Sequence, residues 1–329
     1  MAAVTFPKVR GQPLGITNLL HRPTVFRSKR PLAGPCPTGG LAVEQPRFMP
    51  DNSSVTITNH PLEQPSAFTA LDLIESVRRS RQIPNGSVPR LCFLEFDGDL
   101  TDWLVREGVA IPFPAWPCFH TSLFAVELEG VTCGIIPRTI GGPYAVLVAE
   151  QLAAAGAELI VGITSAGRVS PQLPLPCLVV VTGAIRDEGT SFHYLAPGRE
   201  VACPAPHVPH LVRELAAIGW TVRSGTVWTT DAPYRETKIQ LDHWAAEGVL
   251  AVEMQAASLF AFGTARSVAV ASIAMVSNAV DHEGPQFDTG SQEDGLRILA
   301  ACARAFISCR QGQTPSRANQ PLMHADERG

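Results

Sequence analysis

The chain of 329 residues is long enough for one large domain or two ordinary ones, and with 45% hydrophobic residues it can bury a sizeable core. Its formal net charge of -4 argues against a general nucleic-acid-binding protein, and no apolar run is long and charge-free enough to span a bilayer. The eight cysteines form no C-x-x-C pair, which favours reduced, mostly buried thiols and a cytoplasmic location.

Residues 1–60 differ in composition from the rest of the chain. Six basic residues precede the first acidic residue, Glu44, and prolines and glycines are frequent. A transit peptide has this composition, but we favour a flexible leader, or upstream sequence joined to a true start near Met49. We therefore predict a leader over residues 1–60, a catalytic domain over 61–312 and a loose tail over 313–329.

Apolar periodicity predicts helices and strands in alternation after the leader. The predicted helices cover residues 67–80, a segment ending at 107, 144–155, 208–219, 237–247, 256–266 and 293–311. The predicted strands cover 91–96, 123–128, 131–136, 158–164, 178–182, 221–229, 248–252 and 268–276. This order predicts a single α/β domain with a central mixed, largely parallel sheet flanked by helices on both faces.

The stretch from Val249 to Asp281 reads as strand, helix and strand, with polar residues at both strand ends. Glu253 and Gln255 follow the first strand, and Asn278 follows the second. Ligands of α/β sheets bind at the carboxyl ends of strands, so we expect these side chains to converge on one pocket. A carboxylate and an amide suit the vicinal hydroxyls of a ribose. The alternative is that Glu253 and Gln255 satisfy amides at the start of the next helix.

The segment VEMQAASLFAF, residues 252–262, resembles the VEMExAxLF signature of the nucleoside phosphorylase/uridine phosphorylase family. That family also contains the methylthioadenosine/adenosylhomocysteine and AMP nucleosidases. Four further segments agree with the family in the same order: Gly141–Pro143, Thr164–Gly167, Val179–Pro197 and Trp228–Thr237. The chain is identified as a member of this family over residues 90–310, roughly.

The resemblance implies that Glu253 and Gln255 bind the sugar, with Met254 packed beneath its ring. Gln255 departs from the glutamate usual in the family and carries no charge. Asn278 stands where relatives that act on 6-aminopurines carry an aspartate. An amide cannot act as a general acid at neutral pH, but it can bridge to a 6-oxopurine or a pyrimidine carbonyl. The alternative for Asn278 is a cap on the following turn.

The resemblance places the base-stacking aromatic within Phe192, His193 and Tyr194. Tyr194 matches that aromatic best, and His193 is a candidate for the 5′ end of the sugar; a buried core aromatic is the alternative. Active sites of the family borrow residues from a neighbouring subunit, which implies a homo-oligomer. His120 and Phe119 are our candidates for the residues lent to the neighbour.

The family holds phosphate with arginines that this chain lacks, since Asp102 and Gly162 stand at two of those positions. We expect Arg138 to replace them, because a loop arginine suits bidentate phosphate binding; an exposed, solubilising arginine is the alternative. The residues that we predict to bind phosphate are Arg138, Ser165, Gly167 and Gly98. Thr164, in the same segment, is predicted to contact the substrate.

These assignments predict a nucleoside phosphorylase that uses phosphate as co-substrate and needs no cofactor. Its products are a free base and a pentose 1-phosphate. A hydrolytic nucleosidase is the alternative, because the phosphate arginines are missing and Ser165–Gly167 resembles the nucleosidase Ser-Ala-Gly turn. A non-catalytic nucleoside or nucleotide sensor is the second alternative. We predict no metal site, because Cys203, His207 and His210 have no fourth ligand at a convincing spacing.

Overall fold

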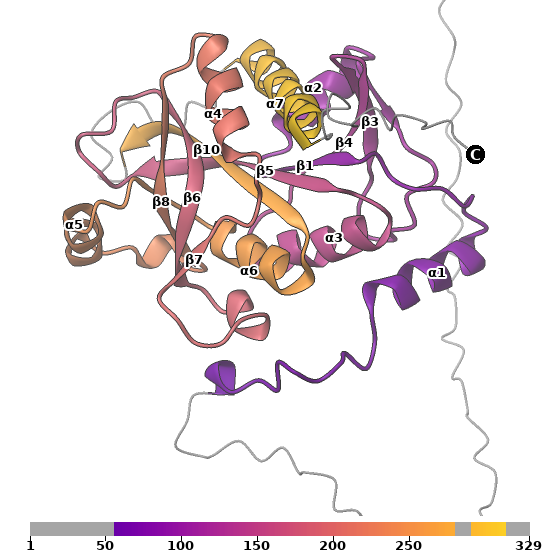
Figure 1. The fold of residues 1–329 in the computed structure, drawn as a ribbon, viewed down its shortest axis with the longest axis horizontal. Coiled ribbons are helices and arrows are strands. Elements are labelled where there is room, and N and C mark those ends of the chain that lie inside the picture. Colours follow the sequence, from indigo (N-terminus) through magenta and orange to yellow (C-terminus); the bar gives the residue numbers. More distant parts are fainter. Residues whose placement is uncertain (1–55, 280–290, 314–329) are drawn as a thin grey trace, which may run out of the picture. The chain divides into compact units, whose positions relative to one another are not determined.

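The computed structural model describes residues 56–279 and 291–313, all within one compact unit that spans residues 50–329 (Figure 1). Most of the predicted leader and of the predicted tail lies outside the described residues, so both boundaries stay predictions. None of the described helices has the length and apolar character needed to cross a membrane.

The elements of the described residues follow the predicted order, with two short strands, Ala110–Pro112 and Glu200–Ala202, that were not predicted. The α-helices are α1 Ala70–Arg81, α2 Asp99–Arg106, α3 Gly142–Ala154, α4 Val208–Ala217, α5 Lys238–Ala246, α6 Ala256–Arg266 and α7 Gln292–Gln313. The strands are β1 Leu91–Glu95, β2 Ala110–Pro112, β3 Phe124–Leu128, β4 Val131–Ile136, β5 Leu159–Arg168, β6 Cys177–Asp187, β7 Glu200–Ala202, β8 Val222–Thr230, β9 Ala251–Glu253 and β10 Ala269–Ala279. Short 3-10 helices are η1 Thr56–Thr58, η2 Thr190–His193 and η3 Pro233–Arg235.

The predicted α/β fold with a mixed sheet is confirmed, and each predicted helix is present within three residues of its expected ends. Local signals explain this agreement. Thr69 and Thr237 cap α1 and α5, each with a reciprocal bond from the residue three positions on. Glu129 and Gly130 both take positive φ angles, as a tight turn between β3 and β4 requires.

The sequence predicts β5 too short. It expects a turn at Ser165–Gly167, but the strand continues to Arg168. Two neighbours hold this extension in place, because β10 pairs with β5 in parallel as far as Arg168 and β9 pairs antiparallel with Gly167 and Arg168. Pairing partners that are distant in sequence therefore overrode the local turn signal.

The sheet closes on itself, which the sequence did not predict. Its order is β10-β6-β8-β9-β5-β1-β4-β3-β2, and β10 also pairs with β5, so that five strands form a ring (Figure 1). Five strand pairings are parallel and five are antiparallel. The two longest pairings, β10 with β5 and β6 with β8, are both parallel, so the predicted mixed, largely parallel sheet is confirmed.

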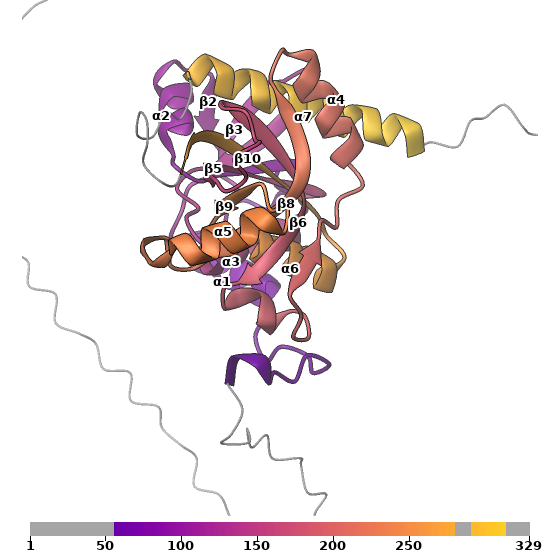
Figure 2. The ribbon, with the colours of Figure 1, turned by 90° about the vertical axis from the view of Figure 1, so that its left-hand side faces the viewer.

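Helices cover the sheet in two layers (Figure 2). On one side α3 packs against α6, and α1 packs against α3. On the other side α4 and α2 pack against α7. Alternate residues of β5 divide between the two cores, with Ile160 and Ala166 in the first and Leu159 and Val161 in the second.

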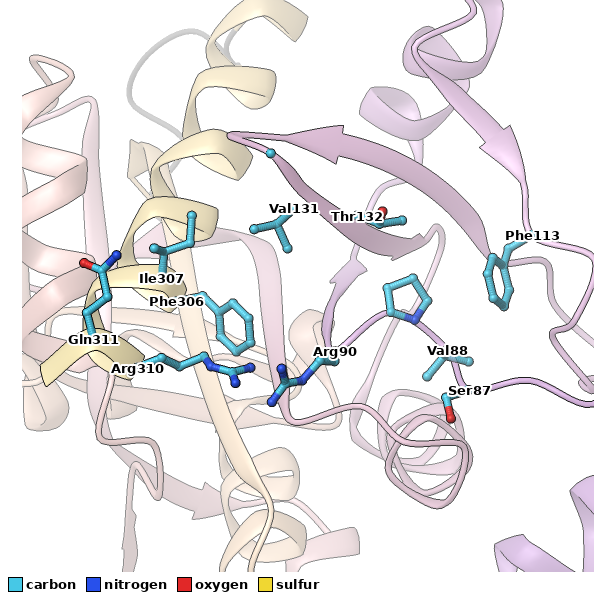
Figure 3. Close-up of a pocket in the computed structure, with 12 residues that line it drawn as sticks. Ser87, Val88, Arg90, Phe113, Val131, Thr132, Phe306, Ile307, Arg310 and Gln311 are labelled. Carbon is cyan, nitrogen blue, oxygen red and sulfur yellow. The ribbon is translucent and has the colours of Figure 1, made fainter. Parts of the chain in front are cut away.

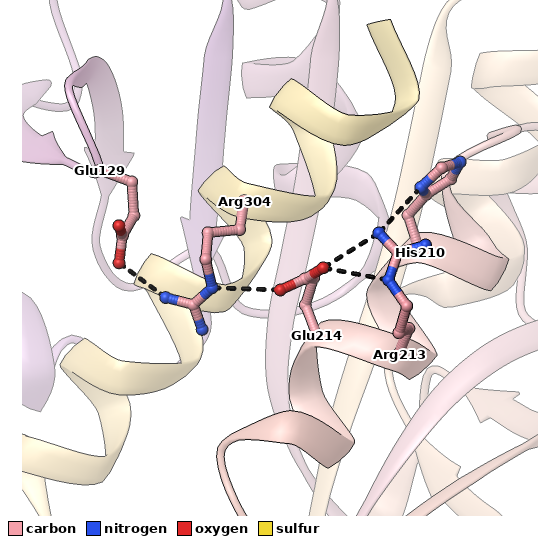
Figure 4. A network of polar contacts seen from close by, with 5 residues as sticks. All are labelled: Glu129, His210, Arg213, Glu214 and Arg304. Atoms are coloured by element: carbon pink, nitrogen blue, oxygen red, sulfur yellow. Dashed lines mark hydrogen bonds and ion pairs between the residues drawn. The ribbon is translucent and has the colours of Figure 1, made fainter. Parts of the chain in front are cut away.

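A polar network ties α7 to its surroundings (Figure 4). The Arg304 guanidinium donates to Glu129 Oε1 at 2.6 Å and to Glu214 Oε2 at 3.1 Å. Glu214 also accepts from Arg213, whose Nη2 lies 3.3 Å from His210 Nδ1. This network joins α7 to α4 and to the β3–β4 turn, on the α4–α7 face of the sheet.

Candidate functional site

The strand ends that carry Glu253 and Asn278 lie on either side of one residue of β5. Gly167 pairs with Val252 of β9 and with Asn278 of β10. β9 runs antiparallel to β5, whereas β10 runs parallel to it. Because β9 has only three residues, Glu253 still lies at this end of β5. The backbone therefore brings the two predicted residues together, while the Asn278 side chain lies outside the described atoms.

Glu253 is buried and caps α6. Its Oε2 accepts from the N–H groups of Gln255 at 2.8 Å and Ala256 at 2.9 Å. Its Oε1 accepts from Thr229 Oγ1 at 2.5 Å and from the Ala256 N–H at 3.1 Å. Burial raises the pKa of Glu253 to about 7, against the effect of these hydrogen bonds and with a further rise from Glu188. The contacts seen here are thus those of the helix-start alternative.

Gln255 is enclosed beside Gly162. The side chain is 0% exposed, and neither its amide oxygen nor its nitrogen has a hydrogen-bond partner among the described residues. A Cβ built on Gly162 would lie 3.6 Å from Gln255 Nε2 and 3.6 Å from Ser272 Oγ, which is also buried without a partner. The same Cβ would lie 3.3 Å from Leu259 Cδ1, so Gly162 is packed closely against these side chains. Met254, between the two predicted sugar residues, is half-buried.

The predicted phosphate residues gather at the carboxyl ends of β1 and β5. The Arg138 side chain lies against Gly98, because a Cβ built on that glycine would be 2.7 Å from Arg138 Cγ. Arg138 forms an ion pair with Asp102, the residue at the position of a missing family arginine. Ser165 Oγ donates to Asp97 Oδ1 at 3.4 Å. The ion pair with Asp102 therefore holds the Arg138 guanidinium beside Gly98, although the family arginine at position 102 is missing.

The cleft beside Ser165 is acidic. Glu95, Asp97 and Asp99 line it, together with Thr164 and residues of α7. Glu95 caps α2 by accepting from the N–H groups of Leu100 at 2.9 Å and Thr101 at 3.0 Å. Burial raises the pKa of Glu95, and burial and Asp99 raise that of Asp97. Thr164 is itself buried and its hydroxyl donates to the Ser165 carbonyl at 2.9 Å.

The predicted base-stacking segment contacts helices and the residues before α1. Tyr194 donates to Glu150 Oε1 of α3 at 3.0 Å and packs edge-on against Phe262 of α6, with ring centroids 6.0 Å apart. Burial, followed by Glu150, raises the pKa of Tyr194. The His193 ring lies 3.9 Å from that of His60. Tyr194 is therefore held in the helical layer, and no described contact joins it to Glu253.

Phe192 and His120 have separate surroundings. The Arg186 guanidinium lies 4.4 Å over the Phe192 ring. His120 Nδ1 lies 3.4 Å from the Tyr144 hydroxyl, and its Nε2 lies 3.3 Å from Gln151 Nε2, both on α3. Burial lowers the pKa of His120. Its neighbour Phe119 is 55% exposed, so this loop presents an aromatic ring to solvent.

The sequence argument missed Glu188, Thr229 and Ser258. Glu188 is buried and accepts from Ser258 Oγ at 2.5 Å, while Thr229 binds Glu253 as described above. No comparable signal marks Glu188, because Arg186 and Asp187 separate it from the apolar part of its strand. The strand was also predicted to end at residue 182, whereas β6 runs to Asp187.

A large cavity lies away from these residues, beside the amino ends of β1 and β4 (Figure 3). It has a volume of about 770 Å³, and the guanidinium groups of Arg90 and Arg310 lie side by side at it. Both arginines bind Glu158, so this carboxylate offsets part of their charge. In the part of the chain that the structure describes, no group of three or more histidine, cysteine, aspartate or glutamate side chains is arranged to hold a metal ion.

Comparisons with known proteins agree on one family. The model of the Phosphorylase superfamily matches residues 92–308. The chain is 24% identical to the uridine phosphorylase of Klebsiella aerogenes over 198 residues, which cover 55% of this chain and 78% of that protein. It is 27% identical to the guanosine phosphorylase of Halorubrum lacusprofundi over 188 residues, covering 54% and 78%. It is 28% identical to the uridine phosphorylase of Treponema pallidum over 166 residues, covering 46% and 64%.

Proposed function

Because the chain belongs to the phosphorylase superfamily, whose model matches residues 92–308, we propose that it is a pentosyltransferase that cleaves nucleosides with phosphate. A phosphate oxygen forms a bond to C1′ of the sugar while the C1′–N bond breaks, and the base leaves with the electron pair. The departing base takes up one proton, which the attacking hydrogen phosphate gives up. The products are a free base and a pentose 1-phosphate. The observation that carries the proposal is the meeting of the β9 and β10 ends at Gly167.

Six of the predicted residues have a proposed task in this reaction. Glu253 and Gln255 stand at the end of β9, where their groups can orient a sugar as positive charge develops on it. Asn278 can donate a hydrogen bond to a carbonyl of the leaving base. Ser165, Gly98 and Arg138 lie together where β1 and β5 end and are the proposed phosphate ligands.

The proposed substrates are nucleosides of bases that carry a ring carbonyl. Asn278 cannot supply a proton as an acid would, so a base that accepts a hydrogen bond on a carbonyl oxygen suits it better than a 6-aminopurine. The names of the matched relatives agree with this choice, because uridine and guanosine both carry such a carbonyl.

A nucleoside panel with and without phosphate tests the proposal. Uridine, inosine, guanosine and adenosine are incubated with the full-length protein, and base and sugar products are separated by chromatography. We expect base release from the oxo-nucleosides that depends on phosphate and yields the sugar 1-phosphate. Equal release of base in phosphate-free buffer, with free pentose as the product, would show the assignment to be wrong.

A hydrolytic nucleosidase is the second candidate, and the charges of the site favour it. Glu95, Asp97 and Asp99 line the cleft beside Ser165, which repels an anion, and Arg138 is already paired with Asp102. Hydrolysis needs only a water molecule beneath C1′. Water is uncharged, so these carboxylates do not repel it as they repel phosphate. Thermal stabilisation by nucleosides without any base release would instead support a sensor.

We also propose that the protein works without a cofactor as a cytoplasmic homo-oligomer. Exposed apolar side chains gather at and near α3, with Ile140 50%, Leu147 46% and Phe119 55% exposed. A partner subunit that covered them would also meet His120. Cys92 and Cys302 are buried thiols, as a reducing compartment favours. Light scattering coupled to gel filtration tests the assembly, and a monomeric mass at micromolar concentration would refute it.

A further inference from the structure

We propose that Glu188 is a positioning residue of the site, which locks the η2 segment onto the first turn of α6. The inference rests on the proposed function for its kinetic consequence, but the structural link itself does not depend on the reaction. Glu188 follows β6 directly and is 6% exposed. None of the sequence signals described above assigns it a task.

One carboxylate oxygen joins two elements. Glu188 Oε2 accepts from the Ser191 N–H of η2 at 2.9 Å and from Ser258 Oγ of α6 at 2.5 Å. Bonds to an ionised acceptor of this kind are about twice as strong as bonds between neutral groups. A cap on η2 alone would explain the bond to Ser191, but the bond to Ser258 crosses between segments that are far apart in sequence.

The η2 side of this link carries the predicted aromatic residues. Arg186, two residues before Glu188, donates to Ser191 Oγ at 2.8 Å and to the carbonyls of Ala196 at 2.7 Å and Leu195 at 3.1 Å. The same guanidinium lies over the Phe192 ring. Arg186 and Glu188, both at the carboxyl end of β6, therefore hold the following loop by hydrogen bonds. These bonds fix the position of Phe192 and its neighbours.

The α6 side of the link begins at the predicted sugar residues. Ser258 lies two positions after Ala256, whose N–H is bound by the Glu253 carboxylate. The two buried glutamates thus hold the same first turn of α6, one from β9 and one from β6. A shift of Glu188 would change how the base side and the sugar side of the site are placed relative to each other.

Helix α3 packs against the contact between Glu188 and Ser258. A Cβ built on Gly142 would lie 2.1 Å from Ser258 Oγ and 3.5 Å from Thr190 Oγ1. The α3 backbone therefore packs directly on the contact between Glu188 and Ser258, and a side chain at position 142 would displace it. Glu188 Oε1 is buried and has no hydrogen-bond partner among the described residues, so the carboxylate has capacity for one more donor.

The test compares Glu188→Ala, Glu188→Gln and Ser258→Ala with the control Glu127→Gln in the full-length protein. Glu127 is an exposed carboxylate on β3 that also accepts from a threonine hydroxyl, that of Thr132. Amide hydrogen exchange is followed by mass spectrometry over residues 190–196 and 256–262. We expect Glu188→Ala and Ser258→Ala to speed exchange in both segments by about tenfold or more, as for the loss of a buried charged hydrogen bond. The control should change neither.

Measurements of KM and kcat on the best nucleoside of the panel then distinguish a role of Glu188 in positioning the site from a role in overall stability alone. We expect Glu188→Ala to raise the KM for nucleoside by about tenfold with a smaller change in kcat, well below its melting temperature. Glu188→Gln should recover most of that loss, because an amide can still accept from Ser191 and bond to Ser258. If Glu188→Ala does not fold, Glu188→Gln and Ser258→Ala carry the comparison.

The two proposals can fail separately. Unchanged exchange in both segments for Glu188→Ala and Ser258→Ala overturns the link, whatever the activity. Faster exchange in a protein whose wild type releases no base would leave the link standing and refute the proposed function. Faster exchange with unchanged KM and kcat would show that the link does not position the site.

Discussion

Replacing Glu253 separates its two candidate tasks, capping α6 and binding a sugar. The carboxylate accepts from two backbone N–H groups and one hydroxyl, and the side chain is 4% exposed. Glu253→Ala removes these acceptors and leaves the N–H groups of Gln255 and Ala256 buried without a partner. Glu253→Gln keeps one carbonyl oxygen but turns an amide N–H toward a backbone donor.

The structure sets the size of the effect. Loss of an N-cap costs about 1 kcal/mol, and each buried donor left without a partner costs about 1–3 kcal/mol. With two such donors, we therefore expect Glu253→Ala to lower the free energy of unfolding by about 3–7 kcal/mol. For Glu253→Gln we expect a loss of about 1–2 kcal/mol, because one acceptor remains.

Urea denaturation followed by circular dichroism measures these losses, with Glu127→Gln as the control on an exposed carboxylate. The denaturant slope must stay equal to that of the wild type for the comparison to hold. A loss below about 1 kcal/mol for Glu253→Ala would refute the capping argument. If Glu253→Gln folds well yet loses most of its kcat/KM for a nucleoside, the same carboxylate also serves the sugar.

Three further predictions concern the same region. Burial raises the folded pKa of Glu253 to about 7, above its ordinary value of 4.5, so the folded state binds the proton more tightly and stability should fall as pH rises from about 4.5 to 7. That decline, about 3 kcal/mol by linkage, should be missing in Glu253→Gln, and parallel pH profiles of the two proteins would contradict it. Gly142→Ala should destabilise the fold by about 2 kcal/mol or more in urea, because the new Cβ overlaps Ser258 Oγ, and an unchanged midpoint would show that α3 can move aside. Arg138→Ala should raise the KM for phosphate by roughly tenfold, and Asp102→Asn should lower it by freeing the guanidinium; initial rates at varied phosphate check both, and equal KM values would place phosphate elsewhere.

The sequence by itself determined the elements and the family. Periodicity and capping residues are local, because each depends on residues within a few positions of one another, and so the helix from Ala256 to Arg266 was placed at its observed ends. The motif around Glu253, together with four further segments in the family's order, was enough to indicate the family. The polar residues at the ends of β9 and β10 were also recognised, and the backbone brings them to one residue of β5.

Only the tertiary structure determined which strands pair and which groups the polar side chains of the site contact. The closure of β10 onto β5, the reversed direction of β9 and the extension of β5 all depend on pairings between distant strands, which no local pattern encodes. The direction in which a buried carboxylate points depends on the donors nearest to it. For Glu253 those donors start α6, and for Glu188 they lie on two segments that meet only in the folded chain. The position of Arg138 beside Gly98 likewise depends on a partner that is distant in sequence. Its guanidinium binds Asp102, which is 36 residues away along the chain.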